Sequence, residues 1–174
     1  MRNKSIIVSV IIVFSFISYY LYTSNKLYGN DKESIVKVIL SIEGYEDMEI
    51  ELLEINDTKD DRIVGFLADN SPSYIEFNKD NKGNYVWRHI ESSKDESFGI
   101  YILTKENPKM MFVTNYDNEI ARMQVDVNDS TLEQTFTPYQ ATVRFLDLPK
   151  TNQNSYEYRN YKYYDTDGNL IREE

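Results

Sequence analysis

The residues closest to a known chemical motif lie near the C-terminus, where acidic side chains alternate before a glycine. A calcium-binding EF-hand loop takes oxygen ligands at positions 1, 3 and 5, glycine at position 6 and glutamate at position 12. With Gly168 at position 6, Asp165 and Asp167 fall at positions 3 and 5, and Glu174 falls at position 12. The spacing therefore raises the question of a calcium site in the stretch YYDTDGNLIREE.

The first ligand position argues against an EF-hand. It falls on Tyr163, which cannot supply a carboxylate, and a register that starts at Asp165 places Leu170 where glycine is needed. The sequence instead favours a loop between two antiparallel strands, with Gly168 at positive φ. We therefore predict a structural turn and assign no metal or cofactor site, while a weak contact of Asp165 or Asp167 with a cation stays open.

The single histidine is the next candidate for chemistry. Alternation along a strand puts His89 on one face with Tyr85 and Trp87, and Arg88 on the other. Beside Glu91, His89 could act as a general base, but the sequence offers no nucleophile or second ligand to pair with it. We favour a half-buried histidine beside a core tryptophan.

Acidic clusters at 46–47 and 57–61 could pair two carboxylates for glycoside hydrolysis. However, the chain contains 29 acidic residues, so acidic neighbours arise easily by chance, and turns or solvated faces account for them. We assign no catalytic residue and predict that the protein is not an enzyme.

Tyrosines gather in the last strands and could form an aromatic platform for sugars or peptides. Tyr156 and Tyr158 share a face, whereas the three-residue step to Tyr161 moves Tyr161 and Tyr163 to the other face unless a bulge intervenes. Strand propensity and cross-strand packing also explain this run, which ends at Tyr164. We favour the packing interpretation.

Composition excludes several classes of function. Asp and Glu number 29 against 19 Lys and Arg, and the three basic residues before Asp31 leave the remainder more acidic still. An acidic body repels phosphate backbones, so we expect no nucleic-acid partner. The absence of cysteine excludes disulfides, thiolate zinc sites and cysteine catalysis, and a single histidine excludes most triads.

The N-terminus predicts a membrane anchor over residues 1–29, spacer included. Residues 6–22 carry no charge and would span about 25 Å as a helix, which is at the short end for crossing a bilayer. Arg2 and Lys4 precede this segment, so the positive-inside rule places the N-terminus in the cytoplasm and the C-terminal part outside.

A cleaved signal peptide, which would release a secreted protein, is the main alternative. Cleavage requires small residues at positions −3 and −1. If Ser18 or Ser24 is at −1, position −3 is occupied by bulky Phe16 or bulky Tyr22. We therefore favour an uncleaved anchor, and a cytosolic location is the third alternative.

The fold class predicted beyond the anchor is α+β, beginning with a helix-on-sheet unit at 30–104. A short amphipathic helix over 30–43 starts at Asn30 as N-cap, with Glu33 at capping-box spacing and Gly44 where the helix stops. The hydrophobic period then changes to two, which predicts four or five antiparallel strands. These strands are expected at 48–55, 62–67, 74–77, 85–90 and 98–103.

Residues 105–109, with Pro108, are the expected linker to a β-sandwich unit at 110–174. In 120–127, the apolar residues Met123, Val125 and Val127 alternate with polar ones, so one face of this strand is dry. Six short strands are expected, at 110–115, 120–127, 131–137, 141–148, 155–164 and 169–172.

One stretch of this second unit carries a resemblance. Leu148 and Pro149 are followed seven residues later by Tyr156, then by a strand and a final hairpin. This order resembles fibronectin type III and related immunoglobulin-like domains, where a leucine and proline precede a corner tyrosine. The resemblance implies a spacer or adhesion architecture and supplies no active-site residues.

The whole chain also resembles uncharacterised small membrane-anchored envelope proteins of Bacillus-like bacteria, because an anchor precedes an acidic, cysteine-free body rich in Lys, Asn, Ile and Tyr. We expect a single-pass binding module whose partner is an envelope protein or wall component. The alternatives are a carboxylate-dependent hydrolase and a regulatory or immunity protein that occludes an envelope partner.

Overall fold

The computed structural model describes residues 27–104, 107–151 and 155–173, together with Ile12 and Ser15. Within these residues, no helix is both long and apolar enough to cross a membrane. The predicted anchor at 6–22 lies outside the described residues apart from Ile12 and Ser15.

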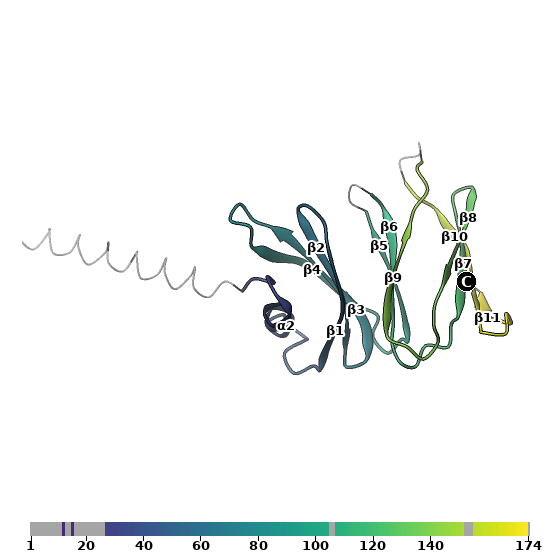
Figure 1. Ribbon diagram of the computed structural model, residues 1–174, viewed down its shortest axis with the longest axis horizontal. Coiled ribbons are helices and arrows are strands. Elements are labelled where there is room, and N and C mark those ends of the chain that lie inside the picture. Colours follow the sequence, from purple (N-terminus) through teal and green to yellow (C-terminus); the bar gives the residue numbers. More distant parts are fainter. Residues whose placement is uncertain (1–11, 13–14, 16–26, 105–106, 152–154, 174) are drawn as a thin grey trace, which may run out of the picture.

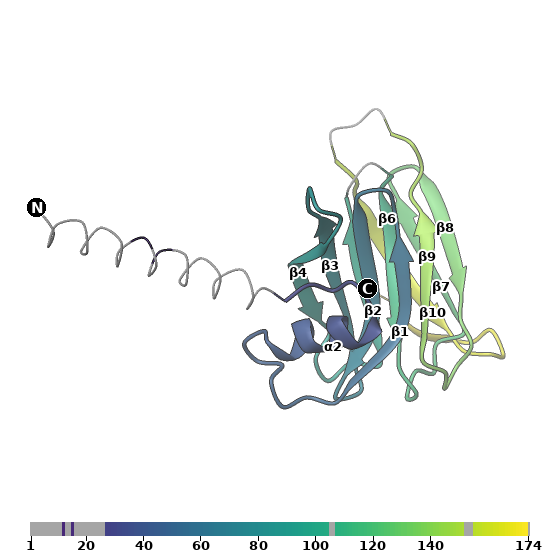
Figure 2. The ribbon, with the colours of Figure 1, turned by 60° about the vertical axis from the view of Figure 1, so that its left-hand side comes forward.

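The described chain is mostly antiparallel β-sheet with one short helix, arranged as a β-sandwich-like stack (Figure 1). The first layer, sheet A, has strand order β1-β2-β3-β4, and helix α2 crosses its outer face (Figure 2). The elements of this layer are α2 (Lys32–Leu40), β1 (Ile50–Asp57), β2 (Asp61–Ala68), β3 (Ser71–Lys79) and β4 (Tyr85–Ser92).

Two further sheets follow along the stack. Sheet B has the order β5-β6-β9 and lies between sheets A and C, and sheet C has the order β11-β10-β7-β8 (Figure 1). Their strands are β5 (Phe98–Leu103), β6 (Lys109–Thr114), β7 (Arg122–Val127), β8 (Ser130–Thr135), β9 (Thr142–Asp147), β10 (Tyr158–Tyr164) and β11 (Leu170–Glu173).

Helix α2 begins one residue later than the sequence predicted. Asp31, not Asn30, is the N-cap: its carboxylate accepts from Ser34 N at 2.8 Å, and Ser34 Oγ accepts from Asp31 N at 2.9 Å. This is a reciprocal capping box with serine in the place of glutamate. Asn30 has another partner, because its side-chain oxygen accepts from Tyr85 N at 2.9 Å.

Three hydrophobic cores hold helix α2 and the three sheets together. The first lies between α2 and sheet A, where Ile35 and Ile39 meet Phe66 and Phe77. The second lies between sheets A and B, and the third joins sheets B and C. Strand β7 shows the period that builds the third core, because Met123, Val125 and Val127 are buried as predicted and the residues between them are not.

Sheet A contacts sheet B directly. Tyr101 of β5 donates its hydroxyl to the carbonyl of Pro72 in β3 at 2.6 Å, and its ring lies 4.5 Å from that of Tyr74. Burial raises the pKa of Tyr101 to about 12. Gly65 allows a close approach of the two sheets, since a Cβ there would lie 2.5 Å from Val143 Cγ2 of β9.

Strand β5 pairs with β6 and so belongs to sheet B. Sheet A therefore has four strands, the smaller of the two numbers expected. The chain passes from sheet A to sheet B between Ser92 and Phe98, whereas residues 105–109, the predicted linker, connect two paired strands of sheet B. Lys105 and Glu106 lie outside the described residues.

Candidate functional site

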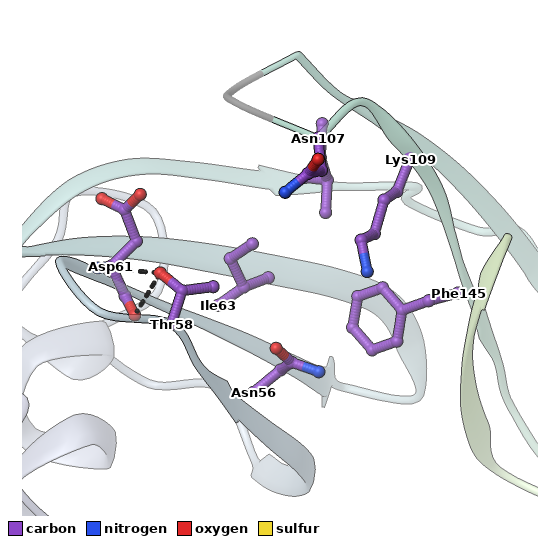
Figure 3. Close-up of a pocket in the computed structure, with 8 residues that line it drawn as sticks. Asn56, Thr58, Asp61, Ile63, Asn107, Lys109 and Phe145 are labelled. Carbon is purple, nitrogen blue, oxygen red and sulfur yellow. Dashed lines mark hydrogen bonds between the residues drawn. The ribbon is translucent and has the colours of Figure 1, made fainter. Parts of the chain in front are cut away.

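A pocket of about 180 Å³ lies between sheets A and B, near the strand ends where β1 turns into β2 (Figure 3). Alternation along the strands creates it, because residues facing sheet B alternate with residues facing α2. Both sheets supply its walls. The lining residues are Asn56, Thr58, Asp61, Ile63, Leu103, Asn107, Lys109 and Phe145.

The floor of the pocket is apolar. Ile63 of β2, Leu103 of β5 and Phe145 of β9 belong to the core between sheets A and B or pack against it. Leu103 is the last residue of β5 and Ile63 is the third residue of β2, so this floor lies near the ends of both strands. The pocket is thus an opening in the inter-sheet core that a small apolar group could fill.

The rim is polar, and part of its hydrogen-bonding capacity is already used. Thr58 Oγ1 accepts from Asp61 N at 3.1 Å, and the carboxylate of Asp61 accepts from the side-chain amide of Asn78. The side-chain amides of Asn56 and Asn107 make no hydrogen bond within the part of the chain that the structure describes. These two amides can each donate to and accept from a ligand.

Lys109 supplies the positive charge of the pocket. Its side chain extends from β6, and the ammonium lies beside the ring of Phe145 (Figure 3). The ammonium also lies 3.1 Å from Asp147 Oδ1, whose side chain is 80% exposed. An ion pair with so exposed a partner is weak, so Lys109 can exchange Asp147 for a ligand anion at little cost.

The DTDG segment is the turn that the sequence predicted. Asp165 Oδ1 accepts from Asp167 N at 2.9 Å and from Asn169 N at 2.8 Å, and its Oδ2 accepts from Asn169 Nδ2 at 3.0 Å. These bonds, with Asn169 as the main contributor, lower the pKa of Asp165. Gly168 has a φ of +82°, and the loop joins β10 to β11.

A second copy of this turn joins β3 to β4. Asp80 Oδ1 accepts from Lys82 N at 2.8 Å and from Asn84 N at 2.9 Å, and Gly83 has a φ of +86°. The shared pattern D-x-x-G-N, DNKGN here and DTDGN at the C-terminus, is visible in the sequence. Its repetition in two hairpins identifies the aspartate as a turn-forming residue.

The histidine strand differs from the prediction. A bulge at Arg88 interrupts the register of β3 and β4, so that Glu76 pairs with His89 and Phe77 pairs with Trp87. The extra residue moves His89 to the face of sheet A that is turned toward sheet B, where its ring lies 5.6 Å from that of Tyr74.

Trp87 and His89 therefore lie on opposite faces, and neither is a core residue. The His89 side chain is 50% exposed and lies 3.5 Å from Glu91 Oε2, while Trp87 is 41% exposed. The pair of His89 and Glu91 proposed from sequence exists, and the aromatic ring beside His89 is that of Tyr74.

A bulge also decides the arrangement of the tyrosines. Asn160, with a φ of +54°, lies in the irregular step of β10 against β7 between Arg159 and Lys162. This step returns the later tyrosines to the inner face, so Tyr163 is buried in the core between sheets B and C. Tyr156, Tyr158 and Tyr161 pack against the same core. The packing interpretation is thus confirmed for these four residues.

Tyr164 is the tyrosine on the outer face of sheet C. The guanidinium of Arg122 lies 3.9 Å from its ring, and its hydroxyl donates to Gln124 Oε1 at 3.0 Å. Glu133 accepts from both Arg122 and Gln124 at 2.9 Å. Both the ring and the hydroxyl of Tyr164 are therefore engaged by neighbouring side chains of sheet C.

The acidic clusters separate into different environments. Asp57 holds Arg62, whereas Asp61 lines the pocket on the opposite face. Near the opposite ends of the strands, where β2 turns into β3, a shallow hollow is lined by Asp69, Asp95, Glu96 and Asp117, among others. Across the described residues, no three acidic or histidine side chains are arranged to hold a metal ion.

The pocket could not be found from the sequence. Its eight residues come from separate strands and loops, and no two of its three apolar floor residues come from the same strand. Comparison of the chain with protein-family models, curated proteins and solved structures finds no match in any of the three. The chemistry of the pocket residues themselves is therefore the basis for a functional assignment.

Proposed function

We propose that this protein is a single-pass membrane protein of the bacterial cell envelope that works by binding. Residues 6–22 hold it in the bilayer, the N-terminus is cytoplasmic, and the β-sheet body lies outside. The uncharged segment after Arg2 and Lys4 supports this topology, as does the acidic character of the body that follows.

The same proposal extends the resemblance to immunoglobulin-like domains. Tyr156 donates its hydroxyl to the carbonyl of Pro149 at 2.8 Å, which is the kind of bond that a corner tyrosine makes. This contact supports an immunoglobulin-like spacer or adhesion architecture for the C-terminal sheets.

The observation that carries the binding function is the composition of the pocket between sheets A and B. An apolar floor of Ile63, Leu103 and Phe145 is bordered by the ammonium of Lys109 and by the carboxamides of Asn56 and Asn107, which make no hydrogen bond to the described residues. Ligand sites in proteins combine a mostly apolar lining with a few convergent polar groups in this way.

These groups define the class of ligand. The cavity is similar in size to apolar cavities of about 150 Å³ that accept a benzene ring. Lys109 pairs with an anion, and the amides of Asn56 and Asn107 can orient a carboxylate by hydrogen bonding. We therefore assign to the pocket a small carboxylate whose apolar body is about the size of one ring.

Nuclear magnetic resonance titration of the isotope-labelled full chain in detergent micelles tests this assignment. Benzoate is the probe, and benzyl alcohol is the uncharged control. We expect benzoate to shift the backbone signals of Asn56 and Lys109 with a Kd of about 1 mM or below, and benzyl alcohol to bind more weakly.

Matched variants locate the binding. Lys109→Met removes the charge in the pocket, and Lys150→Met removes an exposed charge outside it. Loss of benzoate binding in the first variant and retention in the second would support the pocket. Equal binding by both variants would refute it.

The regulatory or immunity alternative differs in its ligand, which would be a protein. Affinity capture from envelope fractions, with the wild-type chain compared with Lys109→Met, separates the two. A partner that both chains retain equally would point to another surface of the molecule.

A further inference from the structure

The chain that leads from the predicted anchor is fastened to the outer face of sheet A. Gly29 N donates to Tyr85 O at 2.8 Å, and Arg62 Nη1 donates to the carbonyls of Gly29 at 2.7 Å and Asn30 at 3.0 Å. Arg62 is almost fully buried. Gly29 and Asn30 are thus part of the folded body, on the side of the stack that carries α2 and β4 (Figure 1).

Trp87 lies next to this attachment point. Gly29 crosses directly over Phe77, because a Cβ on Gly29 would lie 2.3 Å from Phe77 Cε1. Phe77 is the cross-strand partner of Trp87, and the Cβ atoms of such partners are about 5 Å apart. The exposed indole is therefore beside the place where the chain from the predicted anchor meets sheet A.

Two large apolar side chains are exposed here. Leu27, two residues before Gly29 in the chain, is 44% exposed, and Trp87 is 41% exposed. We call Leu27, Gly29 and Trp87 the tether face.

The length of the intervening chain restricts how far this face can lie from the bilayer. Seven residue steps separate Tyr22, the end of the uncharged segment, from Gly29, and they span at most about 25 Å even when fully extended. Stacked sheets lie about 10 Å apart, so sheet C is about 20 Å farther from the attachment point than sheet A.

We propose that the tether face rests on the outer surface of the bilayer, with the indole of Trp87 in the headgroup region. Tryptophan favours this region because its ring is apolar and its N–H is polar. This inference rests on the proposed anchor at 6–22. It adds a fixed orientation, in which sheet A faces the membrane and sheet C faces away from it.

Trp87 is the only tryptophan in the chain, so its fluorescence reports on this face alone. The full chain is reconstituted in phosphatidylcholine vesicles with and without bromine on the acyl chains, since bromine quenches nearby indoles. We expect the brominated lipid to reduce Trp87 emission about twofold.

A matched control places the single tryptophan on the opposite side of the stack. Ile171 of β11 is 43% exposed, close to the exposure of Trp87, and lies in sheet C. In the double variant Trp87→Phe with Ile171→Trp, we expect brominated lipid to leave the emission unchanged.

The outcomes separate the two proposals. If the wild-type chain does not float with the vesicles, the anchor fails and the orientation fails with it. If the chain floats but brominated lipid quenches neither tryptophan, or quenches both equally, the anchor stands and the proposed orientation is wrong.

Discussion

Arg62 and Asp57 form a two-pronged ion pair across the hairpin of β1 and β2, with Nε to Oδ1 at 2.6 Å and Nη2 to Oδ2 at 2.7 Å. The third nitrogen of the same guanidinium binds the carbonyls of Gly29 and Asn30. A planar fork with five donors can make both sets of bonds at once, which a lysine ammonium cannot. One side chain thus joins sheet A to Gly29 and Asn30, at the start of the folded body.

Replacement of Arg62 by methionine tests this link. Methionine keeps an apolar stem but leaves two backbone carbonyls without their donor, so we expect the free energy of unfolding to fall by about 2 kcal/mol. Asp57→Asn should cost less than about 1 kcal/mol, because the Asp57 side chain is 44% exposed. Urea titration measures both, and equal losses would show that the carbonyl contacts contribute nothing.

The same pair predicts an acid-dependent part of the stability. The hydrogen bond from Arg62 lowers the pKa of Asp57 below its ordinary value of 3.8. The folded state therefore gains stability above that value and loses it as the pH falls through the lowered pKa. Thermal melts should show wild type and Asp57→Asn converging as the pH falls below 3.8. A constant difference in Tm would contradict this.

Gly29 is required for close approach and not for positive φ. Gly29→Ala would push a methyl group into the ring of Phe77, and we expect a loss of about 2 kcal/mol. Gly83→Ala is the control, because it has open space around it and should cost about 1 kcal/mol from its positive φ alone.

Shortening the opposing side chain should relieve the clash. In a double-mutant cycle with Phe77→Leu, the two substitutions should cost less together than the sum of their separate losses. Additive losses would mean that Gly29 does not lie against Phe77.

The stacking of sheet A on sheet B is tested at Gly65. A Cβ at this position would lie 2.5 Å from Val143 Cγ2 and 2.9 Å from Met111 Cε, both in sheet B. Gly65→Ala should therefore destabilise the protein, and adding Val143→Ala should recover about 1 kcal/mol of the loss. If Val143→Ala only adds to the damage, the sheets do not meet at this point.

Much of the fold could be predicted because strand periodicity is local. The expected strand at 98–103 coincides with β5, and the dry face of β7 was visible in the alternation around Val125. The partner of each strand was harder to predict from the sequence. The alternation in β5 predicts a strand, but its pairing with β6 depends on contacts made by the whole chain.

Bulges limited the prediction of the candidate sites. One extra residue at Arg88 separated Trp87 from His89, and one at Asn160 brought Tyr163 onto the same core as Tyr156. A single inserted residue reverses the face of every later side chain, and neither bulge is marked by glycine. The pocket was hidden for a related reason, since its walls meet only when two sheets stack.

The most direct test of the proposed topology uses the absence of cysteine from the chain. Single cysteines are introduced as Asn3→Cys before the anchor and Tyr139→Cys on an exposed loop, and intact cells are treated with a membrane-impermeant maleimide. The account predicts labelling of Tyr139→Cys in intact cells and of Asn3→Cys only after permeabilisation, both on the full-length chain. Protection of Tyr139→Cys in intact cells, or loss of the Asn3→Cys segment from the mature chain, would contradict it.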